Sequence, residues 1–168
     1  MVKYADGPTT EVETEITAAP ETVWPFLCDI NVPGQFSEEF VRAEWLDGGP
    51  AMGARFRGYN QHEVVGEWSA ECTVTALDDQ RSFEWTVGDL ELKAAKWRFD
   101  LSPAGEGSLL RFSAEMGPGP SGLTPAIERM PDREDDIVAR RLGEWNANMA
   151  RTVAGIKELA EATPGETT

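Results

Sequence analysis

The sequence predicts an α+β domain in which a seven-stranded antiparallel sheet curves around one long C-terminal helix, with short helices between the first two strands. Two observations predict this fold. Residues 11–17 and 40–116 read as successive strands separated by turn residues. Residues 133–161 carry apolar side chains at helical spacing. A helix of that length spans roughly 40 Å, which is enough to cross the apolar face of the sheet.

The first strand and the helix after it each have a local signature. Residues 11–17 alternate glutamates with less polar side chains, which is typical of a half-buried strand. Pro20 then opens a short helix, because proline is tolerated in the first helical turn. Pro25 conflicts with this helix, and we expect it to shorten or kink the helix.

Turn residues divide the middle of the chain into six further strands. Gly and Pro are frequent in residues 47–50 and 102–107, which mark two of the turns. The expected strands are residues 40–46, 54–61, 64–76, 81–87, 94–101 and 108–116. Alternation gathers aromatic and aliphatic side chains on one face of this sheet, so that face needs a cover.

The long C-terminal helix is the only element large enough to provide that cover. Its apolar stripe consists of Val138, Leu142, Trp145, Met149, Ile156 and Leu159. Arg141, Asn148 and Thr152 form a polar margin beside the stripe. Such a helix can close a core or roof a cavity. A curved sheet fits imperfectly around a straight helix, so we expect a functional site between them.

Composition excludes several classes of partner. The chain has 168 residues, with 30 acidic and 15 basic side chains and a net charge of −15. Such a field repels nucleic acids and anionic membrane surfaces. No apolar run is long enough for stable membrane insertion, and the N-terminus lacks the apolar core of a signal peptide. We therefore expect a cytoplasmic monomer or homodimer with one domain at residues 11–161, a flexible segment at 1–10 and a frayed tail at 162–168.

Catalytic and metal-binding motifs are scarce. His62 is the only histidine and falls at an expected hairpin tip, where an exposed turn residue is the simplest interpretation. Cys28 and Cys72 are far apart and are expected to be buried free thiols. Glu38 and Glu39 fall in a loop and are expected to be solvated. The sequence therefore indicates no catalytic residue, no metal ligand and no cofactor.

Several short segments, taken in order, resemble one known family. They are residues 16–24 (ITAAPETVW), residues 53–60 (GARFRGYN), Trp68, residues 81–85 (RSFEW), residues 97–103 (WRFDLSP), residues 140–142 (RRL) and residues 148–149 (NM). Together they resemble the START-like, polyketide cyclase and dehydrase superfamily, also called SRPBCC, over residues 11–161. The order and spacing of these motifs carry the resemblance, because none of them is specific alone.

The resemblance implies a helix-grip fold, in which the sheet grips the C-terminal helix around a hydrophobic ligand cavity. Members of this superfamily include lipid and sterol carriers, hormone receptors and polyketide aromatase/cyclases. They share no universal catalytic motif. The resemblance therefore supports binding of a small hydrophobic molecule better than it supports any one reaction.

Twelve residues are candidates for contacting such a ligand, because alternation, helical spacing or the resemblance directs them toward the cavity. They are Trp45, Phe56, Asn60, Trp68, Trp85, Trp97, Phe112, Met116, Arg141, Trp145, Asn148 and Met149. Packing in an ordinary core is the alternative for each aromatic residue. Six tryptophans nevertheless exceed what a small core requires, and each buried indole N–H needs an acceptor.

Two polar candidates allow alternative interpretations. Arg141 is suited to a ligand carboxylate or enolate, but a salt bridge with an acidic strand residue is the favoured interpretation. Asn60 is suited to a ligand carbonyl or hydroxyl, but it can also bond to backbone near the end of a strand.

Three functions remain open from the sequence. The first is binding of a lipid, a sterol or a polyketide-like aromatic molecule. The second is cyclisation of a poly-β-ketone, with Arg141 or Asn60 polarising a carbonyl. The third is regulation or co-chaperone activity through surface contacts, which predicts a solid interior.

Overall fold

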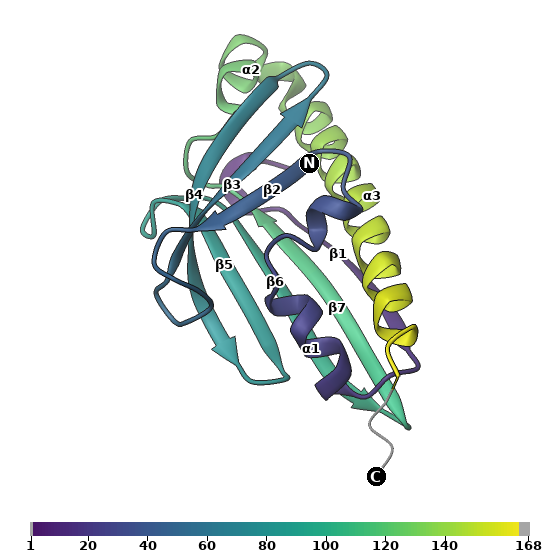
Figure 1. Ribbon diagram of the computed structural model, residues 1–168. Coiled ribbons are helices and arrows are strands. Elements are labelled where there is room, and N and C mark those ends of the chain that lie inside the picture. The colour runs from purple at the N-terminus through teal and green to yellow at the C-terminus, as the bar shows by residue number, and fades with distance from the viewer. Residues whose placement is uncertain (1, 165–168) are drawn as a thin grey trace.

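The computed structural model describes residues 2–164 and contains one antiparallel sheet in the order β1-β7-β6-β5-β4-β3-β2 (Figure 1). The strands are β1 Thr9–Ile16, β2 Phe40–Trp45, β3 Arg55–His62, β4 Gly66–Asp78, β5 Ser82–Gly88, β6 Lys93–Ala104 and β7 Gly107–Met116. Consecutive strands from β2 to β7 are neighbours, and β1 closes the sheet by pairing with β7. The predicted α+β helix-grip fold is confirmed.

Three helices lie on the concave side of this sheet. They are α1 Pro20–Cys28, α2 Thr124–Arg129 and α3 Glu134–Glu161. α3 runs beside β1 and packs most closely on β1 and α1, whereas β2, β3 and β4 curve away from its backbone (Figure 1). No helix within residues 2–164 is both long enough and apolar enough to cross a membrane.

Two local expectations differ from the structure. α1 continues through Pro25 to Cys28, because the proline removes one helical hydrogen bond while Val23 and Leu27 stay anchored in the core. The N-terminal segment, expected to be flexible, packs on the fold through Tyr4. The Tyr4 side chain is 8% exposed, and its hydroxyl donates to the carbonyl of Gly119. Residues 165–168 of the expected frayed tail lie outside the described part of the chain.

The buried face of α3 differs from the predicted stripe at several positions. Val138, Trp145, Met149 and Ile156 are buried as expected, but Leu142 and Leu159 are only half-buried. Thr152, placed by the sequence in the polar margin, is buried instead. The helix leans on the sheet at β1, so side chains on its other flank reach the open space on the concave side rather than a packed surface.

Gly155 sets how closely α3 approaches the segment before β2. A Cβ atom at this position would collide with the aromatic ring of Phe36, which follows a short 3-10 turn at Pro33–Gln35. The Phe36 ring therefore packs directly against the backbone of α3 at Gly155. This contact holds the residues that precede β2 against α3, where they form one wall of the site described below.

We expect Gly155→Ala to lower the free energy of unfolding by about 1–2 kcal/mol, because overpacking at Phe36 outweighs the better helix propensity of alanine. Gly143→Ala in the same helix is the matched control, since nothing lies within 4 Å of an added Cβ there. It should raise stability by about 0.5–1 kcal/mol. Urea unfolding of both variants measures the difference, and equal stabilisation by both would contradict the close contact.

Candidate ligand-binding site

A cavity of about 460 Å³ lies between α3 and the concave face of the sheet. Strands β3 to β7, α3, the segment before β2 and the loop after β7 line it, and most of the lining side chains are apolar or aromatic. A cavity of this size accommodates a small molecule. The solid interior expected for a protein that acts only through surface contacts is therefore not what the structure contains.

Eleven of the twelve predicted residues line this cavity. They are Phe56, Asn60, Trp68, Trp85, Trp97, Phe112, Met116, Arg141, Trp145, Asn148 and Met149. Trp45 does not, because it pairs with Phe56 on the edge strand β2 and packs edge-on against that ring, with centroids 5.4 Å apart. Phe56 thus stands between Trp45 and the cavity. That any of these side chains binds a ligand stays a prediction.

The aromatic side chains form a continuous wall. Trp85 lies at its centre, with its ring centroid 5.6 Å from that of Phe83 and 6.2 Å from that of Phe112. Trp97 meets Trp145 of α3 at 4.6 Å, which connects the sheet wall to the helix. These distances are those of favourable tilted and edge-on ring pairs. The wall is therefore preformed and offers flat apolar surfaces.

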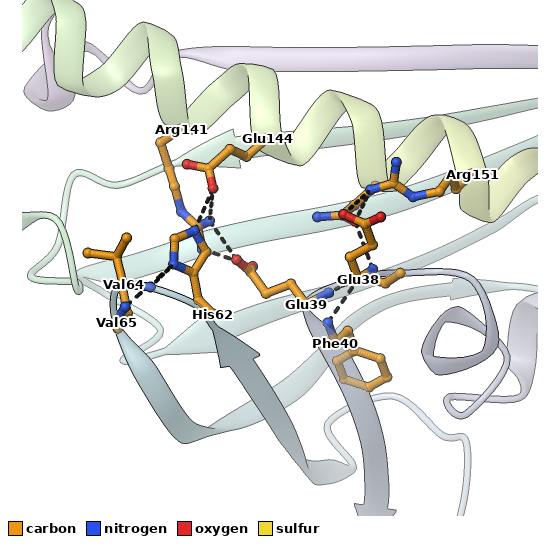
Figure 2. A network of polar contacts seen from close by, with 11 residues as sticks. Glu38, Glu39, Phe40, His62, Val64, Val65, Arg141, Glu144 and Arg151 are labelled. Atoms are coloured by element: carbon orange, nitrogen blue, oxygen red, sulfur yellow. Dashed lines mark hydrogen bonds and ion pairs between the residues drawn. The ribbon is translucent and has the colours of Figure 1, made fainter.

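The polar part of the cavity is an ion pair between α3 and the segment before β2. The guanidinium of Arg141 binds both carboxylate oxygens of Glu39, at 2.6 and 2.8 Å, and lies 3.5 Å from Glu144 (Figure 2). The two paired side chains are only 14% and 15% exposed. The salt-bridge alternative for Arg141 is thus realised, with a partner just outside a strand. Glu39 is not solvated as expected, because Arg141 draws it inward.

His62 ties the tip of the β3–β4 hairpin to α3. Its Nδ1 accepts the backbone N–H of Val64 at 3.1 Å and more weakly that of Val65, while its Nε2 lies 2.6 Å from Glu144 (Figure 2). Because a backbone N–H can only donate, the ring proton sits on Nε2 and is donated to Glu144. The position at a hairpin tip is as expected, but the side chain is 21% exposed and not a free turn residue.

A metal ion does not fit the Glu39, His62 and Glu144 group, although ligand atoms of these three residues lie within 4.8 Å of one another. A metal-bound imidazole normally donates its second N–H to an acceptor, whereas Nδ1 of His62 faces N–H donors. The guanidinium of Arg141 also neutralises Glu39 directly. The group is therefore better described as an ion-pair network.

Asn148 holds the loop beside this network. Its Oδ1 accepts the backbone N–H of Glu38 at 2.9 Å and a guanidinium N–H of Arg151 at 2.6 Å. Thr152 donates to the backbone carbonyl of Asn148 at 2.8 Å. Asn148 thus serves the structure through its oxygen, while its amide nitrogen has no protein acceptor among residues 2–164.

A family model described as "Polyketide cyclase / dehydrase and lipid transport" matches residues 8–161. The chain belongs to this family. Family and fold together support a site for hydrophobic molecules, in agreement with the aromatic cavity. No curated protein matches the chain.

Solved structures with the same fold include proteins of the polyketide cyclase family and others. The Polyketide_cyc-like protein Cgl2372 of Corynebacterium glutamicum is 28% identical over 90% of each chain, with a TM-score of 0.62. The di-domain ARO/CYC BexL from the BE-7585A biosynthetic pathway has a TM-score of 0.71 at 12% identity, covering 95% of this chain and 52% of its own. Ara h 8.0201 has a TM-score of 0.53 at 14% identity, covering 88% and 98%. The last two show the fold alone.

Sequence reasoning missed the part of the lining that lies outside regular elements. Glu39, Ser37 and the loop residues Ser121, Gly122 and Leu123 line the cavity. The polar margin of the long helix gave an indirect signal for Glu39, because a half-buried arginine requires an acidic partner. It could not say which of the acidic residues that partner is.

Burial makes both thiols of this family member poor nucleophiles. Desolvation raises the pKa of Cys72, which lines the cavity, to about 12, and that of Cys28 to about 11. Both groups are therefore protonated thiols at pH 8. We expect native protein to react with Ellman's reagent on the order of 100-fold more slowly than unfolded protein. Rapid reaction of one equivalent in the native state would contradict this environment.

Proposed function

We propose that this protein binds a hydrophobic small molecule, of the size of a lipid fragment, a sterol or a polyketide-like aromatic, between α3 and the sheet. The cavity of about 460 Å³ with a preformed aromatic wall is the observation that carries the proposal. Its membership of a family described as cyclases, dehydrases and lipid transporters supports the same class of ligand. An apolar pocket with a few fixed polar groups is the usual design of such sites.

Narrowing the cavity should weaken binding without unfolding the protein. Ala70 lines the cavity from β4, and Ala70→Leu places three more carbon atoms there. A panel of sterols, fatty-acyl compounds and polycyclic aromatics is first screened by calorimetry against the wild-type protein. We expect the compounds that bind the wild type to bind Ala70→Leu at least about tenfold more weakly. Ser69→Leu is the control, since the Ser69 side chain, next to Ala70 in β4, is exposed and does not line the cavity. Equal affinity in both variants, or no hit at all, would contradict the proposal.

Cyclisation of a poly-β-ketone is the second candidate, because Arg141 and Asn60 both line the cavity and the family includes cyclases. In that case the aromatic wall would fold the chain and Arg141 would stabilise a developing enolate. We expect Arg141→Met, which keeps the apolar stem, to lower the cyclisation rate of a model poly-β-ketone by about 100-fold. Product analysis by mass spectrometry measures the rate. A wild-type rate equal to that without protein would remove this candidate.

A further inference from the structure

Negative charges outnumber positive charges at the polar end of the cavity. Among the lining residues that the structure describes, the charged ones are Asp29, Glu39 and Arg141. Glu144 stands behind Arg141 at 3.5 Å. His62 does not line the cavity, and its two ring nitrogens contact Glu144 and the backbone N–H of Val64. Carboxylates therefore outnumber the guanidinium, and that guanidinium already holds a bidentate partner.

The uncharged polar groups of the cavity are mainly donors. Within residues 2–164, the indole N–H groups of Trp85, Trp97 and Trp145 have no protein acceptor, yet none of them is sealed in the core. The amide nitrogen of Asn148 is also unused, since only its oxygen is bonded. The side-chain amide of Asn60, which lines the cavity, likewise has no protein partner within these residues, so its nitrogen can donate and its oxygen can accept. Unpaired donors in an apolar cavity favour ligands that bring acceptors.

We propose that this cavity selects uncharged ligands that carry oxygen acceptors, such as ketones, esters and ethers, and discriminates against carboxylic acids. This inference rests on the proposed function and narrows its ligand class. An ionised acid would have to displace Glu39 from Arg141, or lie near the carboxylates of Glu39 and Asp29 without a cation to pair with it. An ammonium compound leaves the indole and amide N–H donors unpaired, because it can only donate hydrogen bonds.

Three naphthalenes of nearly equal shape separate charge from acceptor content. They are 2-naphthoate, which is anionic, 2-acetonaphthone, which is neutral with one acceptor, and 2-ethylnaphthalene, which is neutral with none. By calorimetry at pH 7.5 we expect the ketone to bind about tenfold more tightly than the hydrocarbon and the acid to bind most weakly. An acid that binds as tightly as the ketone would overturn the inference.

Removing one carboxylate should shift this preference. In Glu39→Gln the guanidinium of Arg141 loses its bidentate carboxylate partner and keeps only Glu144 at 3.5 Å, so the ratio of the acid's Kd to the ketone's Kd should fall about tenfold. Glu38→Gln is the matched control, because its side chain is 80% exposed and absent from the lining. Its ratio should equal that of the wild type. Circular dichroism establishes that each variant is folded. The comparison of the three ligands on the wild-type protein tests the inference even if a variant does not fold.

The outcomes distinguish the two proposals. Failure of the ketone and the hydrocarbon alike to bind contradicts the hydrophobic cavity function and, with it, this selectivity. Binding of all three with equal affinity leaves the cavity function intact and overturns only the selectivity. An unchanged ratio in a folded Glu39→Gln variant also overturns the role assigned to the ion pair.

Discussion

The packing of a straight helix against a strongly curved sheet determines the rest of this structure. α3 is 28 residues long and meets the sheet most closely at β1, with α1 beside it. The sheet then curves away through β4, β3 and β2 (Figure 1). The cavity lies between α3 and the concave face of the sheet. Aromatic side chains can line such a gap from both sides, but they do not fill it. Stability comes from the side where helix and sheet touch, and space for a ligand comes from the side where they separate.

Polar side chains of α3 connect the helix to the edges of the open side. Arg141 reaches Glu39 and Glu144 reaches His62, so α3 is connected to the segment before β2 and to the β3–β4 hairpin (Figure 2). Half-buried ion pairs contribute little net stability, because desolvation offsets most of their attraction. Their main effect is on the position of the segments that they connect. They hold two otherwise separate edges of the cavity at fixed distances and leave the polar end with a defined charge.

The fold follows from local patterns, and the site follows from contacts that local patterns do not encode. Alternation and turn residues predicted every strand to within a few positions, and helical spacing predicted α3. Thr152 was misplaced because the tilt of α3 over the sheet decides which flank is buried. The pair of Glu39 with Arg141 joins residues 102 positions apart, and His62 with Glu144 joins residues 82 apart. Thirty acidic side chains offered possible partners, so spacing alone could not select these two.

The ionisable groups of the cavity are arranged for recognition more than for proton transfer. Burial keeps Cys72 a protonated thiol, with a pKa of about 12. Both oxygens of Glu39 are held by Arg141, and the ring nitrogens of His62 are both engaged. The Asp29 carboxylate lies at the exposed rim and accepts the backbone N–H of Asn31 at 2.9 Å. A general base needs an unoccupied lone pair within reach of the substrate, whereas binding needs only fixed donors and a shaped wall. Among the described residues that line the cavity, the indole N–H groups of Trp85, Trp97 and Trp145 and the amide of Asn60 have no protein partner. An N–H donor can orient a bound molecule, but it cannot remove a proton from it.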